Sequence, residues 1–309
     1  MKESIASNPL KQEDVNTYFQ GQSSYWKDIY VGSGVQAEIY RQRQAMVLTW
    51  IDDLALAPGS RVLEVGCGAG FLSVALAQRG LRVHAIDSAE KMVELTRRHG
   101  EVSGTAELIS VDFGDVHALA FEDGSFDLVI AVGVIPWLEK PELAIQEMAR
   151  VTRPGHTIIL TADNRMRLIY LLDPLANPAL ASLRRDVKAM LEHIGLSQVS
   201  KSRTKENLYD CRFIDETLTS AGLIKDRSIT LGFGPFTFLQ HRFLPHTLDI
   251  ALHRRLQFLA DRNVPGFRFS GSQYLVLARK LASRPSGRPT SAEKSVSDAT
   301  KVPQGEMLL

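Results

Sequence analysis

The stretch from Arg61 to Asp87, RVLEVGCGAGFLSVALAQRGLRVHAID, decides the fold of this chain. It opens with a short run of β-branched and aliphatic residues, which is typical of a strand buried on both faces. A glycine-rich turn follows, then a helical segment that ends at Gly80 and a second apolar run that ends at Asp87. The order strand, helix, strand within about 30 residues predicts a βαβ unit and therefore a parallel sheet.

The same alternation of helix and strand continues along the chain. After the first unit, the patterns fall at 88–98, 106–112, 126–134, 141–151 and 156–163. After a proline-marked helical stretch they resume at 213–223, around 228–234 and at 273–279. Such alternation predicts an α/β fold in which helices cover both faces of a doubly wound, mostly parallel sheet.

These patterns divide the chain into five segments. We expect an N-terminal helical lid at 1–60, a ligand-binding core at 61–163, an inserted helical cap at 164–212, the C-terminal part of the core sheet at 213–280 and a tail at 281–309. The tail is rich in Ser, Pro, Lys and Thr and poor in large apolar residues. Because such a composition cannot offset its ordering entropy, we expect the tail to be disordered.

The composition excludes several classes of protein. The 36 basic and 35 acidic side chains nearly cancel, which argues against a nucleic-acid partner bound over the whole surface. The two cysteines, Cys67 and Cys211, lie in no metal-ligand spacing, so we expect neither a metal nor a disulfide. The sequence shows no signal peptide and no apolar run near the roughly 20 residues of a membrane span, which predicts a cytoplasmic protein.

Glycines at alternate positions, Gly66, Gly68 and Gly70, stand where the first strand turns into its helix. Glycine lets the backbone approach a ligand closely, and the following helix offers free N–H donors for a carboxylate. Asp87 ends the second strand about 20 positions later, where an acidic side chain can accept both hydroxyls of a ribose. Tight packing alone is the alternative explanation for the glycines. The dinucleotide fingerprint would need glycine at Phe71, which disfavours a nicotinamide cofactor.

The combination of Glu64, the alternating glycines and Asp87 resembles the first two motifs of the class I, Rossmann-like S-adenosylmethionine-dependent methyltransferases of the small-molecule type. The resemblance is clearest over 61–163 and implies a seven-stranded sheet with a reversed last strand. It also implies S-adenosyl-L-methionine as cofactor. The residues expected to bind that cofactor are Glu64, Gly66, Gly68, Gly70, Asp87, Asp112, Phe113 and Val132.

The methyl acceptor is less determined by the sequence. Many quinone methyltransferases of this family carry a histidine after the fourth strand, where this chain has Ile135-Pro136-Trp137, so we assign no catalytic residue. Three residues in expected cap segments are candidate general bases: Tyr25, His241 and His246. An in-line methyl transfer mainly requires alignment and exclusion of water, and it proceeds in some enzymes without a dedicated base.

Aromatic and apolar residues in the expected lid and cap suit an apolar, aromatic or lipid-linked small molecule, methylated at oxygen or carbon. The aromatic residues of the lid are Tyr18, Phe19, Tyr25, Trp26 and Tyr30. Apolar residues beside arginines are compatible with a membrane surface and equally with a buried cap. Two alternatives stay open: an NAD(P)-dependent oxidoreductase on the same fold, and a non-catalytic module that binds S-adenosylmethionine. The oligomeric state is left open.

Overall fold

The computed structural model describes residues 11–21, 30, 32–193, 206–239 and 241–282. Within them a seven-stranded sheet has the strand order β3-β2-β1-β4-β5-β9-β6. Its strands are β1 (Arg61–Val65), β2 (Arg82–Asp87), β3 (Ile109–Phe113), β4 (Phe126–Ala131), β5 (Thr152–Asp163), β6 (Leu223–Leu231) and β9 (Gln273–Lys280). β1 to β5 pair in parallel, and β9 runs antiparallel to both β5 and β6. The predicted Rossmann-like sheet with a reversed last strand is confirmed.

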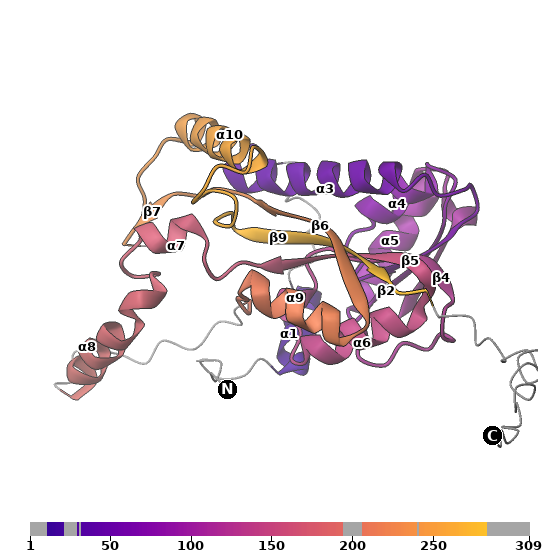
Figure 1. Cartoon of the computed structure of the whole chain (residues 1–309), viewed down its shortest axis with the longest axis horizontal. Helices are drawn as coiled ribbons and strands as arrows, with labels where there is room; N and C mark the ends of the chain where they lie inside the picture. The colour runs from indigo at the N-terminus through magenta and orange to yellow at the C-terminus, as the bar shows by residue number, and fades with distance from the viewer. Residues whose placement is uncertain (1–10, 22–29, 31, 194–205, 240, 283–309) are drawn as a thin grey trace, which may run out of the picture.

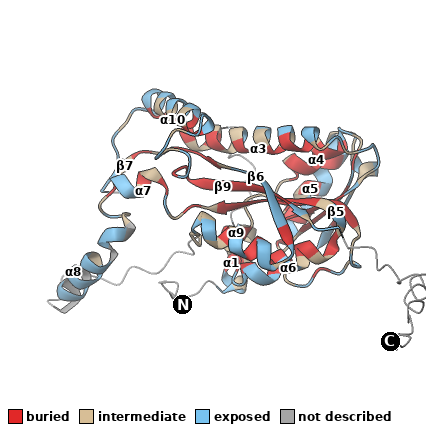
Figure 2. Ribbon diagram, in the orientation of Figure 1, coloured by how far each residue is buried: buried red, intermediate tan, exposed pale blue. Residues whose placement is uncertain are grey.

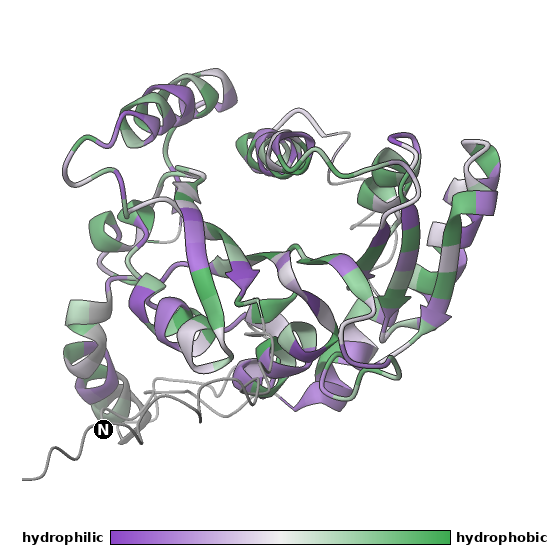
Figure 3. Ribbon diagram, turned by 45° about the vertical axis from the view of Figure 1, so that its right-hand side comes forward, coloured by the Kyte–Doolittle hydropathy of each residue, from purple (hydrophilic) through white to green (hydrophobic). Residues whose placement is uncertain are grey.

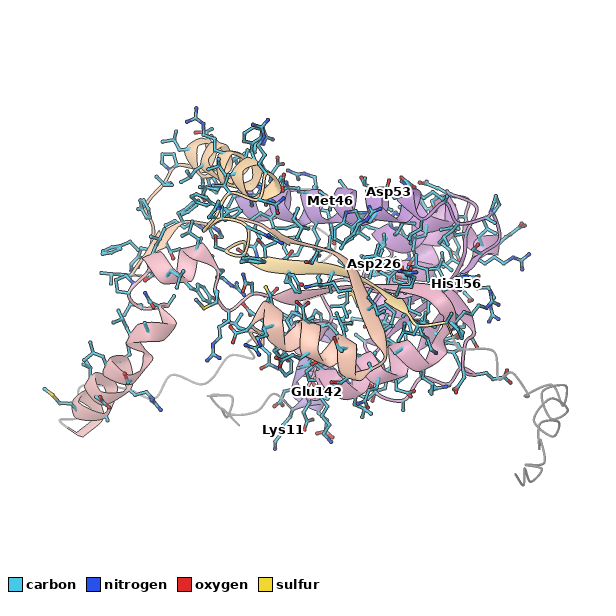
Figure 4. All side chains as sticks on the ribbon, in the orientation of Figure 1. Lys11, Met46, Asp53, Glu142, His156 and Asp226 are labelled. Carbon is cyan, nitrogen blue, oxygen red and sulfur yellow. The ribbon has the colours of Figure 1, made fainter. Side chains whose placement is uncertain are left out.

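Helices cover both faces of the sheet, as Figure 1 shows. α3 (Val35–Asp53), α4 (Phe71–Ala77) and α5 (Glu90–Val102) lie on one face, and α6 (Pro141–Val151) and α9 (Cys211–Ser220) on the other. The labelled residues Met46 and Asp53 mark the course of α3 along the sheet in Figure 4. Hydrophilic and hydrophobic residues alternate along the outer helices, as expected when one side packs on the sheet and the other meets water (Figure 3).

The central strand β4 explains why two cores form. All of its residues are buried, and successive side chains point to opposite faces. Leu128 and Ile130 join the core beneath α3 and α4, whereas Val129 and Ala131 join the core beneath α6. Figure 2 shows the buried strands between the two helical layers.

Two features of the C-terminal half differ from the sequence-based expectation. β6 begins at Leu223, earlier than the strand expected around 228–234. The sequence did not reveal this start, because Ile224 and the four polar or charged residues after it are exposed on an edge strand and show no apolar periodicity. A small hairpin of β7 (Thr237–Phe238) and β8 (His241–Arg242) was not expected. Strands of two residues leave no periodic signal in a sequence.

Further helices lie in the expected lid, in the expected cap and in parts of the chain that were expected to belong to the core. These are α1 (Gln12–Gly21), α7 (Leu168–Leu172), α8 (Ala181–His193) and α10 (His246–Asp261), with short 3₁₀ turns at η1 (Ala106–Leu108), η2 (Ile135–Trp137) and η3 (Pro178–Leu180). In Figure 1, α8 projects from the body of the molecule. Among the described helices none is both long and apolar enough to cross a membrane. The segment boundaries stay predictions, and the expected disordered tail lies outside the described residues from 283 onward.

Candidate active site

A cavity of about 500 Å³ opens at the carboxyl ends of β1, β2, β4 and β5. This is the edge at which open parallel sheets bind ligands, because the connecting loops diverge there. The loop after β1 forms one wall, and the ends of β4 and β5 form another. α1, α3, α7 and η2 contribute further wall, together with the residues that follow β3 and β6 and those at the start of β9.

The three glycines after β1 differ in what constrains them. Their φ angles are all positive, at 67°, 56° and 79° for Gly66, Gly68 and Gly70, a region that favours glycine. A Cβ on Gly66 would overlap the side chain of Val134, and a Cβ on Gly70 would lie 2.9 Å from the Cα of Thr96. A Cβ on Gly68 would meet nothing within 4 Å, and Gly68 lines the cavity. Packing therefore fixes Gly66 and Gly70, whereas the open side of Gly68 leaves room for a ligand.

Asp87 is held at the cavity wall by backbone donors on two sides. The N–H of Gly68 donates to its Oδ2 at 3.0 Å, and the N–H of Ala89 donates to its Oδ1 at 2.9 Å. Burial raises the pKa of this carboxyl, and the backbone hydrogen bonds oppose that rise. Each carboxylate oxygen has more than one lone pair, so both can still accept a hydrogen bond from a ligand.

Glu64 lies beneath the glycine loop and is only 4% exposed. The hydroxyl of Ser73 donates to its Oε2 at 2.5 Å. Burial raises the pKa of Glu64 to about 8, the Ser73 hydrogen bond opposes this shift, and the nearby charge of Asp87 adds to it. Glu64 is therefore largely protonated at neutral pH and acts there as a neutral hydrogen-bonding group.

The structure gathers five of the eight predicted site residues at the cavity and leaves three outside it. Those at the wall are Glu64, Gly66, Gly68, Asp87 and Val132. Gly70 packs on Thr96 instead of facing the cavity. Asp112 is exposed and pairs with His84 at 2.9 Å, and Phe113 is 62% exposed. Neither Asp112 nor Phe113 is part of the wall.

Residues just beyond β3, and not Asp112 or Phe113, line the cavity. β3 extends to Phe113, and the chain reaches the cavity only after it, at Gly114, Asp115 and Val116. Asp115 accepts a hydrogen bond from the backbone N–H of His117 at 2.9 Å. The glycine before Asp115 was the available signal, because a break of this kind marks the end of a strand.

Arg43 is a site residue that the sequence analysis missed. It comes from α3, is 4% exposed and lines the cavity. Its Nη2 donates to the hydroxyl of Tyr30 at 3.3 Å, and its guanidinium lies 4.4 Å from the ring centroid of Tyr40. Its Nε has no hydrogen-bond partner, and no described carboxylate lies within ion-pair distance of it. A buried guanidinium in this state favours binding of an anion.

A second polar group lies across the cavity at the end of β5. Arg167 donates to Asp163 at 3.2 Å. Burial raises the pKa of Asp163, and the charges of Arg167 and Arg43 oppose the rise. The Oγ of Ser272 and the Oε1 of Gln273 also line the cavity and are buried without a hydrogen-bond partner. This side therefore offers both donors and acceptors to a bound molecule.

Aromatic rings from distant parts of the chain contact one another at the cavity wall. The ring of Tyr18 on α1 stacks on Trp137 in η2 with centroids 5.5 Å apart, and Phe19 meets the edge of Trp137 at 5.1 Å. Tyr30 packs on Phe71 at 5.1 Å. All of these rings line the cavity. Of the predicted aromatic cluster, Tyr25 and Trp26 lie outside the described residues.

None of the three residues considered as general bases is placed at this cavity. His241 and His246 are exposed and are absent from its wall, and Tyr25 lies outside the described residues. In the part of the chain that is described, no group of three His, Cys, Asp or Glu side chains is arranged to hold a metal ion.

Comparison with known proteins identifies the central segment. Residues 63–160 match the family model described as a methyltransferase domain. The ubiquinone biosynthesis O-methyltransferase of Paracidovorax citrulli is 36% identical over 126 residues, which cover 40% of this chain and 52% of that protein. The protein of the same name from Hahella chejuensis is 39% identical over 121 residues, covering 38% and 49%. The chain thus spans about half the length of the curated relatives it matches.

Solved structures share the fold over more of the chain. Magnesium protoporphyrin IX methyltransferase from Synechocystis PCC 6803, determined with bound SAH, superposes with a TM-score of 0.57 and 21% identity over 87% of this chain and all of that one. The cyclase SpnF superposes with a TM-score of 0.58 and 16% identity over 91% of this chain and all of its own. At these identities the likeness concerns the fold, and the local geometry of the cavity has to supply the rest.

Proposed function

We propose, from the match of residues 63–160 to a methyltransferase domain, that the protein is a class I methyltransferase that transfers a methyl group from S-adenosylmethionine to a small molecule. The observation that carries the proposal is the pairing of Gly68, whose open side faces the cavity, with the carboxylate of Asp87 held beside it. A cofactor with a ribose and a charged amino-acid end fits this pair of features.

The donor set around the cavity fits S-adenosylmethionine residue by residue. Asp87 would accept the ribose hydroxyls, and Gly66 and Gly68 would let the backbone approach. Val132 would pack against the cofactor from the end of β4. Arg43 supplies a positive charge that would bind the methionine carboxylate through charge-assisted hydrogen bonds.

The proposed reaction needs little chemistry from the protein. When bound, S-adenosylmethionine would supply a methyl group on a positively charged sulfur; the acceptor would attack the methyl carbon in line with the carbon–sulfur bond, which breaks to leave S-adenosylhomocysteine. The chain has to align the acceptor and exclude water, and the rings of Tyr18 and Trp137 are placed to do the second. Where the acceptor loses a proton, Asp163 is a carboxylate at the cavity wall to which that proton could pass.

We propose an apolar, aromatic or lipid-linked metabolite as acceptor, methylated at oxygen or carbon. The aromatic wall formed by Tyr18, Phe19 and Trp137 supports a ring or an apolar chain. The names of the curated relatives support oxygen as the accepting atom. A near-neutral composition and an enclosed aromatic wall favour a small molecule over a nucleic acid.

The test has two steps. Isothermal titration of the purified protein with S-adenosylmethionine and with NADH separates the proposal from the oxidoreductase alternative, and we expect binding of the first alone. Incubation with methyl-labelled S-adenosylmethionine and an extract of the source cell then reports transfer. Label in the organic phase supports the apolar acceptor, and label only in the aqueous phase indicates a polar one. Binding without transfer would favour a non-catalytic module.

A further inference from the structure

Large apolar side chains are exposed on neighbouring elements at one end of the molecule. They come from α7, α8 and the stretch around the hairpin β7–β8, and Met190 and Phe243 are 65% and 60% exposed. We call six of them the apolar rim: Leu172, Leu183, Val187, Met190, Phe238 and Phe243. Figure 2 shows how much of α8 is exposed. Exposed apolar residues gathered in this way mark interaction surfaces in soluble proteins.

The contribution of α8 is an amphipathic face. Leu183, Val187 and Met190 recur at intervals of four and three, so they share one side of the helix. The helix is tied to the turn after α7, because the guanidinium of Arg184 donates to the carbonyl of Asn177 at 2.6 Å and to that of Pro174 at 3.1 Å. The exposed face therefore has a defined place beside α7.

The hairpin and α7 connect the rim to the cavity. The hydroxyl of Thr237 in β7 donates to the carboxylate of Asp173 at the end of α7 at 2.8 Å. On α7, Ile169 and Tyr170 line the cavity, while Leu171 and Leu172 are exposed. One short helix thus separates the proposed acceptor site from the rim.

The charges beside the rim are mostly positive. Arg185 on α8 and Arg242 on β8 are exposed, and Arg165 precedes α7. Between 165 and 193 and between 237 and 248, Asp186 is the one exposed carboxylate among the side chains that the structure describes. Apolar residues with arginines around them match a surface that combines hydrocarbon with negative charge.

We propose that the apolar rim docks on the surface of an anionic lipid bilayer. The apolar side chains would enter the boundary between headgroups and acyl chains, and the arginines would remain among the anionic headgroups. Docking in this way would bring α7 and the cavity next to the bilayer, where an acceptor dissolved in lipid is concentrated. This last consequence rests on the proposed methyl transfer, whereas the docking does not.

Co-sedimentation with vesicles tests the docking directly. The full-length protein is mixed with vesicles of phosphatidylcholine alone, or with vesicles of equal parts phosphatidylcholine and phosphatidylglycerol. The double variant Leu183→Glu, Val187→Glu places carboxylates on the exposed face of α8. Both native side chains are exposed, so we expect the variant to fold. Val102→Glu is the matched control, because Val102 is an exposed apolar residue (83%) at the end of α5. Titration with S-adenosylmethionine is run on every protein.

We expect the native protein and Val102→Glu to bind the anionic vesicles, and the double variant to bind about ten-fold or more weakly, because it removes two apolar side chains from the docking face and adds two negative charges. Added salt should weaken binding. Equal binding by the double variant, or no binding by the native protein, would overturn the proposal. A native dimer that the double variant converts to monomer would assign the rim to a second copy of the chain instead. If the native protein does not bind S-adenosylmethionine, the proposed function is refuted, and the docking result is unaffected.

Discussion

The two sides of the cavity are built in different ways. The glycine-loop side, Glu64 to Asp87, comes from one βαβ unit, and most of its contacts are made within that unit or with α5; Gly66 is the exception, because it packs against Val134 after β4. The opposite side combines Asp163 at the end of β5, Arg167 just before α7 and Gln273 at the start of β9. The first side is a local construction with steric constraints, whereas the second is an assembly of polar groups from distant segments. We infer that the first serves a common cofactor and the second a particular acceptor.

The largest effect is expected at Gly70, where the glycine loop packs directly against the backbone of α5. Gly70→Val should lower the free energy of unfolding by about 4 kcal/mol, because it adds a side chain against the backbone of Thr96 at a positive φ. Gly68→Val is the control, with a similar φ but open space, and should lose about 1–2 kcal/mol. Urea denaturation measures both. Equal losses would show that packing does not distinguish the two glycines.

The buried carboxyl of Glu64 should make stability depend on pH. Its pKa is raised to about 8 in the folded protein, so its contribution is complete below about pH 4.5, the unfolded value, and is lost as the pH rises through 8. Between pH 5 and pH 8, Glu64→Gln should gain about 3 kcal/mol of unfolding free energy relative to the native protein. Denaturation curves of both proteins at several pH values give this difference. A difference that stays constant with pH would contradict the protonated state.

Arg43 lies between the two sides, and its replacement should separate binding from stability. Arg43→Met should weaken S-adenosylmethionine binding by about 1.5–3 kcal/mol, the worth of hydrogen bonds to a charged group. The unfolding free energy should change by less than about 1 kcal/mol, because the guanidinium forms no ion pair within 4.0 Å with a described carboxylate and Asp163 keeps its own partner, Arg167. Arg41→Met, an exposed neighbour on α3, should leave the affinity unchanged. Calorimetric titration decides, and unchanged affinity in Arg43→Met would exclude Arg43 from the cofactor site.

Asp87→Ala tests the glycine-loop side at its polar centre. We expect S-adenosylmethionine to bind about 1–3 kcal/mol more weakly, since the carboxylate is expected to accept the ribose hydroxyls. The same titration measures it, with Asp53→Ala at the end of α3 as an exposed acidic control. An affinity equal to that of the native protein would refute the ribose assignment.

The smallest effect is expected at Asp112, which the sequence analysis placed in the site and the structure places outside it. Asp112→Asn should change the affinity for S-adenosylmethionine by less than about 0.5 kcal/mol, because the side chain is exposed and pairs with His84. Titration beside Asp115→Asn compares the two positions. A larger loss at Asp112 would restore the original assignment and indicate that β3 ends differently when ligand is bound.

The sequence by itself determined the sheet and the glycine-loop side. Strand and helix periodicity at 61–163 reports burial directly, and the positions of Gly66, Gly68 and Asp87 are fixed by the geometry of a single βαβ unit. Local spacing was also enough to disfavour a dinucleotide cofactor, because Phe71 stands where the dinucleotide-binding fingerprint requires glycine.

Only the tertiary structure decided the rest. Arg43 looks like any polar residue of a surface helix until α3 packs on the sheet and buries it at the cavity. Ser272 and Gln273 reach the site because β9 inserts between β5 and β6. The paired residues of β5 and β9 are more than a hundred positions apart, so no local spacing in the sequence reports the pairing. Whether Asp112 or Asp115 faces the cavity depends on the residue at which β3 ends, and a shift of one residue turns a strand side chain to the opposite face.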